Sequence, residues 1–521
     1  MAERIDTLAD SHLAWRAAAP PSIADNIRRQ PAYVVLCIVV ALIGCGLFAY
    51  SQTKAFAQDE GYHLLAAQLI LDGKRPYLDF LYPQTPLSAY WNAGWMSLLG
   101  QGWRQVHGVG AVTASAPVML IADFVFVRAP NAAWRLPAAT LAAVAFGLNA
   151  GVFEFTTVGQ PYALCLLLMA AALRLSVASP GGVRPLMTAG AGFCASAAAC
   201  ASLLTAPAAL VLLVWTLVVG RPGSRLLKAA AFVAGACLPV VPLLWLFVQG
   251  PRQVVFNVIE YQLLYRLVDW PGAYGHDLGV YLSWANSGQA LLLVALAAVA
   301  LVAARRGNGW ARARRAEVCL CGWLGAALAL HISTAHPTFA WYYLLLVPLL
   351  AVLAPIGLFE FAARVGGALR PWLAVGAVMA VMIASLAHTL HADWDDLGWK
   401  DFERLAAKVN EVTPKGGQIL ADEHIYFLTG RAPPEGAANM DSHKLSLPPQ
   451  LAALLHVTSH ADFDRQVAAG LYDTVALCEP DLIEKLDLDD LYAQKYELPT
   501  TDCAVFWQPL SLRSGETTEA Q

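Results

Sequence analysis

Charged side chains are scarce in this chain: Asp, Glu, Lys and Arg make up only 14% of its 521 residues. Soluble domains carry about 25%. Hydrophobic residues make up 58% of the chain, and its mean hydropathy is +0.51. This composition excludes a single water-soluble globule. The net charge of -4 gives no indication of nucleic-acid binding. The chain also lacks long internal repeats and low-complexity segments.

Long apolar runs are abundant. Stretches of about 20 residues recur between Pro31 and Leu390, and each is long enough to cross a bilayer. The sequence therefore predicts an all-α polytopic membrane protein. We expect eleven spans, at 31–51, 109–127, 136–153, 161–178, 186–203, 207–220, 229–249, 287–304, 318–334, 340–359 and 372–390.

The distribution of Lys and Arg predicts the orientation of these spans. With segment 1–30 in the cytoplasm, the cytoplasmic segments hold 18 such residues, and the outside loops up to residue 390 hold six. This excess agrees with the positive-inside rule. An odd number of spans then places the tail, 391–521, outside. The polar segment before the first span is too long for a usual signal peptide, so we expect no cleavage at Ala55-Phe56-Ala57.

The first external loop, about 52–108, is long. It contains a helical pattern at Glu60–Leu71 and an apolar stretch at Pro86–Leu99. We predict that the second stretch lies flat on the outer surface, because a further span there would invert every later loop and break the charge rule. A second long external loop covers about 250–286.

The tail has the composition of a small α/β domain. We predict helices at Trp399–Val412 and Ala461–Ala469. Strands are expected at Gln418–Ala421, Thr474–Cys478 and Ala504–Trp507.

The ten cysteines fall into two groups. Eight lie in predicted spans, where cysteine acts as a small apolar residue: Cys37, Cys45, Cys165, Cys194, Cys200, Cys237, Cys319 and Cys321. Cys478 and Cys503 lie in the exported tail, in or beside predicted strands. An oxidising compartment would let these two form a disulfide, but sequence alone leaves open whether their Cα atoms come within reach.

Asp59 and Glu60 are the strongest candidates for chemistry. They begin the helix that follows the first span, and carboxylates at a membrane surface are costly to desolvate. One interpretation is structural, because a helix dipole favours acids in its first turn. The other makes Asp59 a general base in a partly dry cleft, with Glu60 orienting a neighbouring group.

The surrounding motifs carry a resemblance. They read D-E-x-Y-H from Asp59, Y-P-Q-T-P-L from Tyr82, Y-W from Tyr90, H-P-x-x-x-W-Y-Y from His336 and I-Y-F-L-T-G-R from Ile425. This pattern resembles the GT-C glycosyltransferases. The most similar branch is the family 39-like bacterial enzymes, which include protein mannosyltransferases and lipid A aminoarabinose transferases. The resemblance spans the chain, but each motif is short.

The resemblance implies inverting transfer of a sugar from a polyprenyl-phosphate donor to a lipid, glycan or protein of the cell envelope. The reaction would occur on the outer face of the bacterial plasma (inner) membrane, with Asp59 as base. Two departures stand out. Gln84-Thr85 replaces a Glu-Lys pair of the aminoarabinose transferases, and Glu154 and Gln160 stand near the positions of a second family acid and an Arg.

A departing phosphate needs positive charge or hydrogen-bond donors. Candidates for contact with substrate or phosphate are Lys54, Lys74, Arg75, Arg252, Arg266, His331 and His336, with Tyr62, His63, Gln84 and Tyr342. Structural interpretations stay open for most of them: snorkelling for Arg252 and Arg266, a solvated turn for Lys74 and Arg75, and interfacial positions for His331, His336, Tyr342 and Glu154. No metal cofactor is expected, although a divalent cation beside Asp59 and Glu154 stays an alternative.

Two other classes of function compete with a transferase. A transporter or flippase of lipid-linked saccharides predicts ionisable residues near mid-bilayer, and this chain gathers its charges at the membrane edges instead. A non-catalytic assembly subunit would use the tail to recruit partners. Membrane lipids, a lipid-linked sugar and an envelope acceptor are the partners expected under the first hypothesis.

Overall fold

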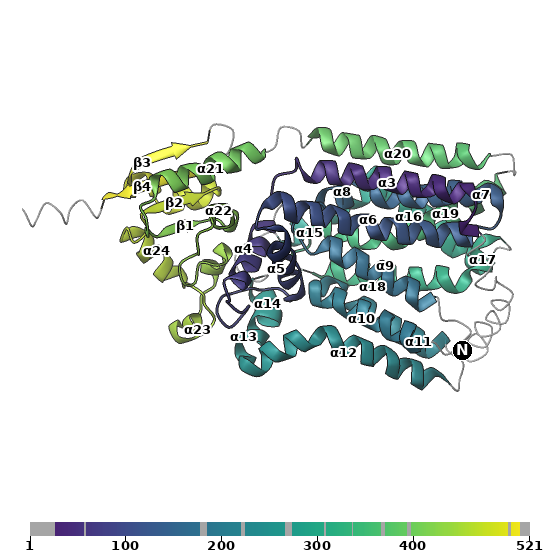
Figure 1. Cartoon of the computed structure of the whole chain (residues 1–521), viewed down its shortest axis with the longest axis horizontal. Coiled ribbons are helices and arrows are strands. Elements are labelled where there is room, and N and C mark those ends of the chain that lie inside the picture. Colours follow the sequence, from purple (N-terminus) through teal and green to yellow (C-terminus); the bar gives the residue numbers. More distant parts are fainter. Residues whose placement is uncertain are drawn as a thin grey trace, which may run out of the picture.

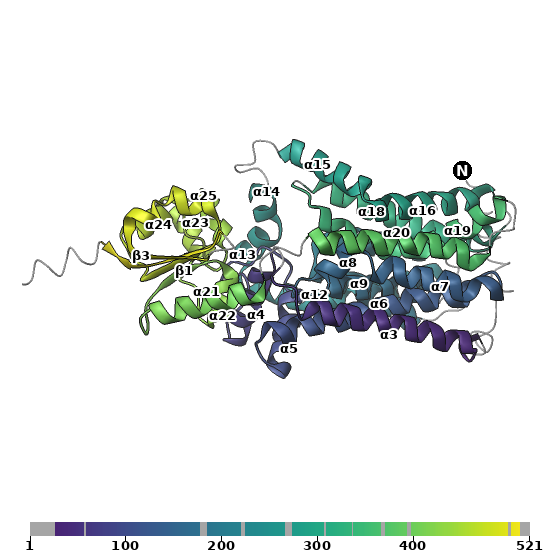
Figure 2. The same ribbon diagram turned by 90° about the horizontal axis from the view of Figure 1, so that it is seen from above.

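The computed structural model describes residues 27–56, 59–177, 185–219, 224–265, 273–306, 309–335, 337–365, 370–392, 398–498 and 502–510. The helices before residue 393 form an elongated bundle, and a small domain with a β-sheet lies at one end of it (Figure 1 and Figure 2). The expected combination of a helical membrane part and a small α/β domain is confirmed.

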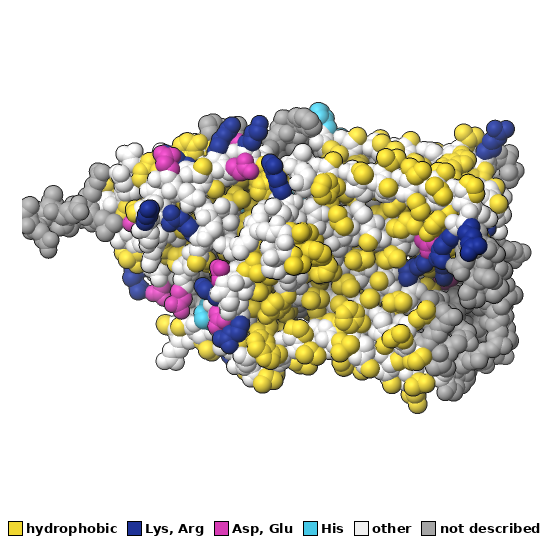
Figure 3. Space-filling view, viewed as in Figure 1, with side chains coloured by type: hydrophobic (Ala, Val, Ile, Leu, Met, Phe, Trp, Pro, Cys, Tyr) yellow, Lys and Arg dark blue, Asp and Glu magenta, His cyan; other side chains and the backbone are white. Residues whose placement is uncertain are grey.

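Seven described helical segments are long and apolar enough to cross a membrane. They are α3 (Pro31–Ser51), α6 (Trp103–Arg128), α12 (Arg225–Gln249), α16 (Gly288–Arg306), α18 (Arg315–Thr334), η4 with α19 (Ala340–Leu346 and Val347–Arg364) and α20 (Pro371–Ala392). Figure 3 shows hydrophobic side chains over the bundle and charged side chains gathered toward its two ends. The chain is a multi-pass membrane protein.

The other four predicted spans are also helices, but they are shorter, with 14 to 17 residues. They are α7 (Ala132–Gly147), α9 (Tyr162–Val177), α10 (Pro185–Ala201) and α11 (Ala206–Val219). Local breaks shorten them. Asn149 caps a separate helix, α8 (Ala150–Phe155), by accepting the N–H of Val152. After α10, extended backbone at Ser202 leads into the 3-10 turn η1 (Leu203–Thr205). Membrane-spanning length is therefore supported for seven of the eleven predicted spans.

Several short helices lie at the end of the bundle that faces the C-terminal domain (Figure 2). From the first loop come α4 (Glu60–Leu71) and α5 (Leu87–Leu99). The second long loop contributes α13 (Pro251–Val255), a π-helical turn η3 (Phe256–Glu260), α14 (Tyr261–Tyr265) and α15 (Ala273–Asn286). The predicted helix at Glu60–Leu71 is confirmed. With 13 residues, α5 is too short to span a bilayer. At the other end of the bundle, α17 (Trp310–Ala313) connects α16 to α18.

The C-terminal domain is built on a four-stranded sheet of order β1-β2-β4-β3. The strands are β1 (Ile419–Ala421), β2 (Thr474–Leu477), β3 (Tyr492–Glu497) and β4 (Ala504–Pro509). β1 and β2 are parallel, while β4 runs antiparallel to both β2 and β3. The sequence prediction missed β3. This edge strand carries Lys495 and Glu497, and charges of this kind protect sheet edges from further pairing.

The helices of this domain are α21 (Trp399–Val412), α22 (Glu423–Thr429), η6 (Met440–Lys444), α23 (Pro449–Leu454), α24 (His460–Ala468), α25 (Pro480–Lys485) and α26 (Leu488–Leu491). The predicted helix at Trp399–Val412 is confirmed, and α24 matches the one predicted at Ala461–Ala469 to within one residue.

The C-terminal domain packs directly onto the first loop. Helix α22 lies against α4, and the approach is close at Gly61, where a Cβ atom would lie 2.8 Å from the backbone N of His424. Beside this contact, the indole rings of Trp399 and Trp103 stack with centroids 3.5 Å apart. The domain therefore touches the helix that begins with Glu60.

Candidate active site

A cavity of about 550 Å³ opens where several helices end, on the side of the bundle that faces the C-terminal domain. Its described walls come from the start of α4, the loop after α4, the α10–α11 break, η3 and α14, and the ends of α9, α18 and η4. The lining residues are Asp59, His63, Gln84, Gln160, Pro161, Tyr162, Ser202, Leu203, Leu204, Val258, Ile259, Gln262, Leu263, His331, Thr334, Ala335 and Tyr342. Five predicted site residues, Asp59, His63, Gln84, His331 and Tyr342, thus meet in one place.

Asp59 stands at the N-terminus of α4, and its carboxylate reaches the cavity. It makes no capping hydrogen bond to the helix. Desolvation by the surrounding protein raises the pKa of Asp59 to about 6, and the negative charge of Asp441 in the C-terminal domain adds to this rise. The residue nevertheless keeps an exposed surface. A carboxylate with this pKa, open to a cavity, is suited to accept a proton near neutral pH.

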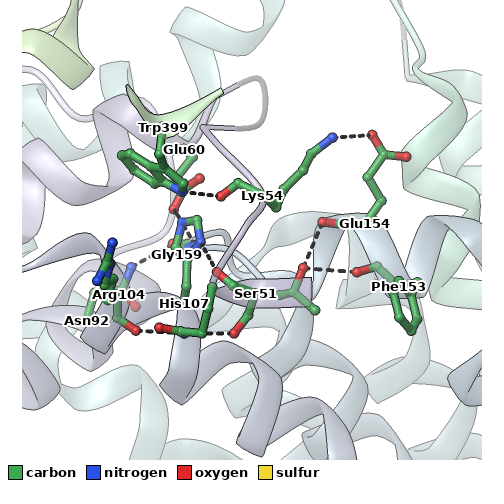
Figure 4. A network of polar contacts seen from close by, with 12 residues as sticks. Ser51, Lys54, Glu60, Asn92, Arg104, His107, Phe153, Glu154, Gly159 and Trp399 are labelled. Carbon is green, nitrogen blue, oxygen red and sulfur yellow. Dashed lines mark hydrogen bonds and ion pairs between the residues drawn. The ribbon is translucent and has the colours of Figure 1, made fainter. Parts of the chain in front are cut away.

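Glu60 points the other way and is fully buried. Figure 4 shows its carboxylate among α6 and the α8–α9 connection: Oε1 lies 2.6 Å from Nε2 of His107 and accepts the N–H of Gly159 at 2.7 Å. The other ring nitrogen of His107 lies 3.0 Å from the carbonyl O of Ser51. A carbonyl only accepts, so Nδ1 carries a proton and a second proton lies between Nε2 and Glu60. Glu60 therefore fixes α4 to the bundle and positions Asp59.

Gly159 is required at this junction by close packing. A Cβ atom there would lie 2.6 Å from Leu64 and 3.0 Å from Oε1 of Glu60. The carbonyl of Gly159 in turn accepts a hydrogen bond from Asn92 of α5 at 2.7 Å. The first loop and the α8–α9 connection are thus joined by main-chain contacts that a side chain would block.

A second set of hydrogen bonds holds the cavity wall behind Asp59. Nδ1 of His63 lies 2.9 Å from the hydroxyl of Tyr82, whose backbone N–H is bound by Asn257 of η3 at 2.8 Å. Burial lowers the pKa of His63 to about 3, so its ring is neutral. The hydroxyl of Tyr62 is buried and has no hydrogen-bond partner among the described residues.

Other predicted site residues lie away from this cavity. Glu154 pairs with Lys54 (Nζ–Oε1 3.4 Å) and lines a separate cavity of about 220 Å³. The guanidinium of Arg75 pairs with both carboxylate oxygens of Asp79 at 2.9 Å. The structure therefore does not bring Glu154 or Arg75 together with Asp59: neither lines the same cavity, and each forms an ion pair elsewhere.

Arg252 pairs with Glu260 at 2.6 Å on an exposed surface, and Lys74 borders a cleft against the C-terminal domain. Arg266 and His336 lie outside the described residues. Among the lining residues that the structure describes, none is Lys or Arg. In the described part of the cavity wall, neutral hydrogen-bond donors and His331 thus stand where cations were candidates.

Sequence reasoning missed several residues of this region. Ser202, Gln262 and Thr334 line the cavity, and His107 binds Glu60 from within the helix of a predicted span. The sequence does contain an indication for Ser202, because this residue lies where two short apolar runs adjoin. A lone His beside an apolar run is also a signal, because a polar group there must find a partner.

A metal ion beside Asp59 and Glu154 was one alternative, but the two side chains line different cavities. Within the part of the chain that the structure describes, the one group of three His, Cys, Asp or Glu side chains close enough to share an ion is Asp422, His424 and Cys478, in the C-terminal domain.

No protein-family model and no curated protein matches this sequence. Among solved structures, the chain is similar to ArnT from Cupriavidus metallidurans bound to undecaprenyl phosphate. The TM-score is 0.64 at 16% identity, covering 92% of this chain and 98% of that chain. The apo state of that protein gives a TM-score of 0.65 at 15% identity, with the same coverage.

The chain has a GT-C-like fold. Its similarity to a yeast protein O-mannosyltransferase, the Pmt1-Pmt2 complex of S. cerevisiae, covers 46% of this chain and 36% of that chain at 14% identity and a TM-score of 0.35. The GT-C-like fold extends over both the helical bundle and the C-terminal domain, since 92% of the chain aligns with ArnT.

Proposed function

We propose that this protein is an integral-membrane glycosyltransferase that moves a sugar from a polyprenyl-phosphate carrier to an acceptor of the bacterial cell envelope. The acceptor hydroxyl gives its proton to Asp59 and attacks the anomeric carbon with inversion, and the lipid phosphate leaves. The reaction takes place on the outer side of the inner membrane, with the N-terminus in the cytoplasm. The single observation that carries this proposal is Asp59, a carboxylate with a raised pKa at the wall of the cavity, in a chain with a GT-C-like fold.

The cavity has the size and the chemistry for such a donor. Its volume of about 550 Å³ lies within the usual range for small-molecule sites, about 300–1,000 Å³. One side is apolar, with Ile259 and Leu263 54% and 61% exposed. A prenyl chain fits this side and a sugar fits the polar side. The similar ArnT structure was solved with undecaprenyl phosphate, which agrees with this class of carrier.

Neutral hydrogen-bond donors would receive the phosphate. Gln84, Gln160, Ser202, Gln262 and Thr334 surround the polar part of the cavity. Such donors stabilise a developing negative charge when they are oriented beforehand. The amide of Gln262 is held by a hydrogen bond to the carbonyl of Pro83 at 2.6 Å. His331 can add positive charge when it is protonated.

The substitution Asp59→Asn tests the proposal. Removing a general base lowers the rate by about 10² to 10⁴-fold. We expect a deletion strain to lack one sugar of its envelope lipids or glycans by mass spectrometry. The wild-type gene should restore this sugar, and the gene carrying Asp59→Asn should not.

The matched control is Asp72→Asn, the same chemical change at the other, exposed end of α4. It should restore the sugar fully. Equal restoration by the Asp59→Asn and Asp72→Asn variants would refute Asp59 as the base. Accumulation of an intact lipid-linked saccharide on the cytoplasmic side would favour a transporter instead.

A further inference from the structure

Three potential metal ligands converge at one edge of the C-terminal sheet. Asp422 follows β1, His424 lies in the first turn of α22, and Cys478 follows β2. Their ligand atoms all lie within 4.8 Å of one another. Because β1 and β2 are parallel neighbours, their carboxyl ends deliver these residues to the same place. Nothing in the proposed transfer reaction uses this group.

Two contacts link the three ligands to one another. Oδ2 of Asp422 accepts the backbone N–H of Cys478 at 2.8 Å, and Nε2 of His424 lies 3.8 Å from Sγ of Cys478. In a tetrahedral zinc site, with Zn–S about 2.3 Å and Zn–N about 2.0–2.1 Å, sulfur and nitrogen ligands are about 3.6 Å apart. The observed separation is therefore close to that of two ligands on one ion.

A fourth ligand lies across the sheet. Leu477 of β2 pairs with Ala504 of antiparallel β4, so the next residues outward, Cys478 and Cys503, stand opposite each other. In this structure they are joined by a disulfide. A disulfide sulfur is a poor ligand for zinc, whereas a thiolate is a strong one.

We propose that reduction of the Cys478–Cys503 disulfide creates a zinc-binding site formed by Asp422, His424 and the two cysteine thiolates. Two thiolates, an imidazole and a carboxylate suit a tetrahedral, borderline-soft divalent cation such as Zn²⁺. The site does not depend on the proposed transferase activity, since none of its four residues lines the cavity at Asp59.

A dithiol supplies the electrons that reduce the Cys478–Cys503 disulfide. The dithiol attacks the disulfide and leaves as its own cyclic disulfide, so that two electrons and two protons pass to Cys478 and Cys503. Zn²⁺ then replaces the two thiol protons, which go to solvent. A disulfide oxidant reverses the sequence: it takes two electrons from the two thiolates, is itself reduced to thiols, and the ion is released. The fold thus offers either a covalent link or a metal link between β2 and β4.

The bound ion would lie next to the helix that carries Asp59. A Cβ atom built on Gly61 of α4 would lie 2.8 Å from the backbone N of His424. The centroid of the His424 imidazole ring lies 5.5 Å from that of the Phe56 ring. His424, a proposed metal ligand, is therefore itself in contact with α4.

Co²⁺ titration of the full-length protein in detergent tests the site. The protein is used either oxidised, or reduced with a dithiol that is then removed by desalting. We expect the reduced form to bind one more equivalent of Co²⁺ than the oxidised form, with thiolate-to-cobalt absorption that Zn²⁺ abolishes. Cys478→Ser should remove this absorption. His424→Gln and Asp422→Asn should each weaken binding by at least about tenfold, as even outer-shell changes cost about 10 to 100-fold.

The matched control is the double variant Cys45→Ser, Cys237→Ser, which removes two exposed free thiols of the membrane helices. It should bind Co²⁺ like the wild type. Circular dichroism and elution volume show whether each variant folds, and the two conservative changes at Asp422 and His424 serve if Cys478→Ser does not fold. Equal Co²⁺ binding by oxidised and reduced protein, or unchanged binding by both conservative variants, would overturn the proposal.

Discussion

At the scale of single residues, two adjacent carboxylates have opposite environments. Asp59 reaches the cavity and makes no cap on α4. Glu60 is buried and is bound by His107 and by the N–H of Gly159. The difference follows from helix geometry, since successive residues of a helix point about 100° apart. One acid is thereby open to a substrate, and the other is committed to holding the helix.

The pH dependence of activity follows from Asp59. Its pKa of about 6 means that the base is protonated in acid, so transfer should fall about tenfold per pH unit below about pH 6. His63 does not titrate in this range, because burial lowers its pKa to about 3. Initial rates with a purified donor, measured from about pH 4 to 8, would check this. A flat profile between these values would contradict the role of Asp59.

Asp59 should also affect the stability of the folded protein, but in the opposite direction: activity rises with pH, whereas its contribution to stability falls. The pKa of Asp59 is raised above its ordinary value of 3.8, so the folded state holds the proton more tightly than the unfolded chain. Its stabilising contribution is present below about pH 4 and is lost as the pH rises to about 6. The melting temperature of the wild type should therefore fall relative to Asp59→Asn across this window. Burial also raises the pKa values of Asp422 and Glu423, to about 7 and about 8. Both proteins contain these residues, so their contributions to the melting temperature cancel in this comparison.

At the scale of elements, the packing of α22 on α4 links the C-terminal domain to the candidate site. Phe56, Phe402 and Phe427 form edge-to-face ring pairs beside this contact, with Phe56 common to both pairs. Such pairs add about 0.5–1.5 kcal/mol each beyond their buried area. The domain thus contributes Asp441 to the surroundings of Asp59 and also supports the helix from outside.

Gly61→Ala tests this link between elements. The new Cβ atom would lie 2.8 Å from the backbone N of His424, so α22 and α4 must separate. We expect a loss of about 1–3 kcal/mol of stability and a clear loss of activity, because Asp59 moves with α4. Thermal unfolding in detergent and transfer assays would measure both.

Gly94→Ala is the matched control. Gly94 lies within α5, and a Cβ atom there meets nothing within 4 Å. Ala is favoured over Gly inside a helix by up to about 1 kcal/mol, so this variant should be as stable as the wild type or slightly more so. If Gly61→Ala behaved like Gly94→Ala, the proposed coupling through α22 would be wrong.

At the scale of the whole molecule, α4, which begins beside Asp59, and the C-terminal domain lie at one end of the bundle, and a group of Lys and Arg side chains lies at the opposite end (Figure 1 and Figure 3). At that opposite end, Asp123 pairs with Arg28 and Arg174 at 2.8 and 2.6 Å. Asp123 also accepts a hydrogen bond from the hydroxyl of Tyr33 on α3 at 3.0 Å, while Arg128 binds Glu317 at 2.7 Å. The positive-inside rule predicts that this end faces the cytoplasm.

Labelling of introduced cysteines would test this orientation. A membrane-impermeant maleimide added to intact spheroplasts should label Glu411→Cys, whose wild-type side chain is 67% exposed in the C-terminal domain. It should label Arg364→Cys, at the end of α19, only after the membrane is opened. The reverse pattern would place Asp59 in the cytoplasm and would contradict the proposed reaction on an external lipid carrier.

The sequence by itself determined the helices of the bundle that were predicted as spans, part of the C-terminal domain and the class of protein. Hydrophobic length located every helix that was predicted as a span, and short-range patterns located α4, α21, α24 and three of the four strands. These features are local, because they depend on runs of apolar residues and on residues close in the chain. Local patterns singled out Asp59 and Glu60, and the family resemblance added His63 and Gln84 of the same loop.

Only the tertiary structure decided which distant residues share a site. Ser202, Gln262 and Thr334 come to Asp59 from three different segments, and Glu154 turns away to Lys54. No spacing in the chain carries this information, since it arises where helix ends meet after the bundle has packed. Arg75 and Arg252, two of the cations expected to bind a phosphate, are engaged by nearby acids instead. An exposed Arg close to an Asp or Glu in the chain can form such a local ion pair at little cost, even though the pair adds little stability.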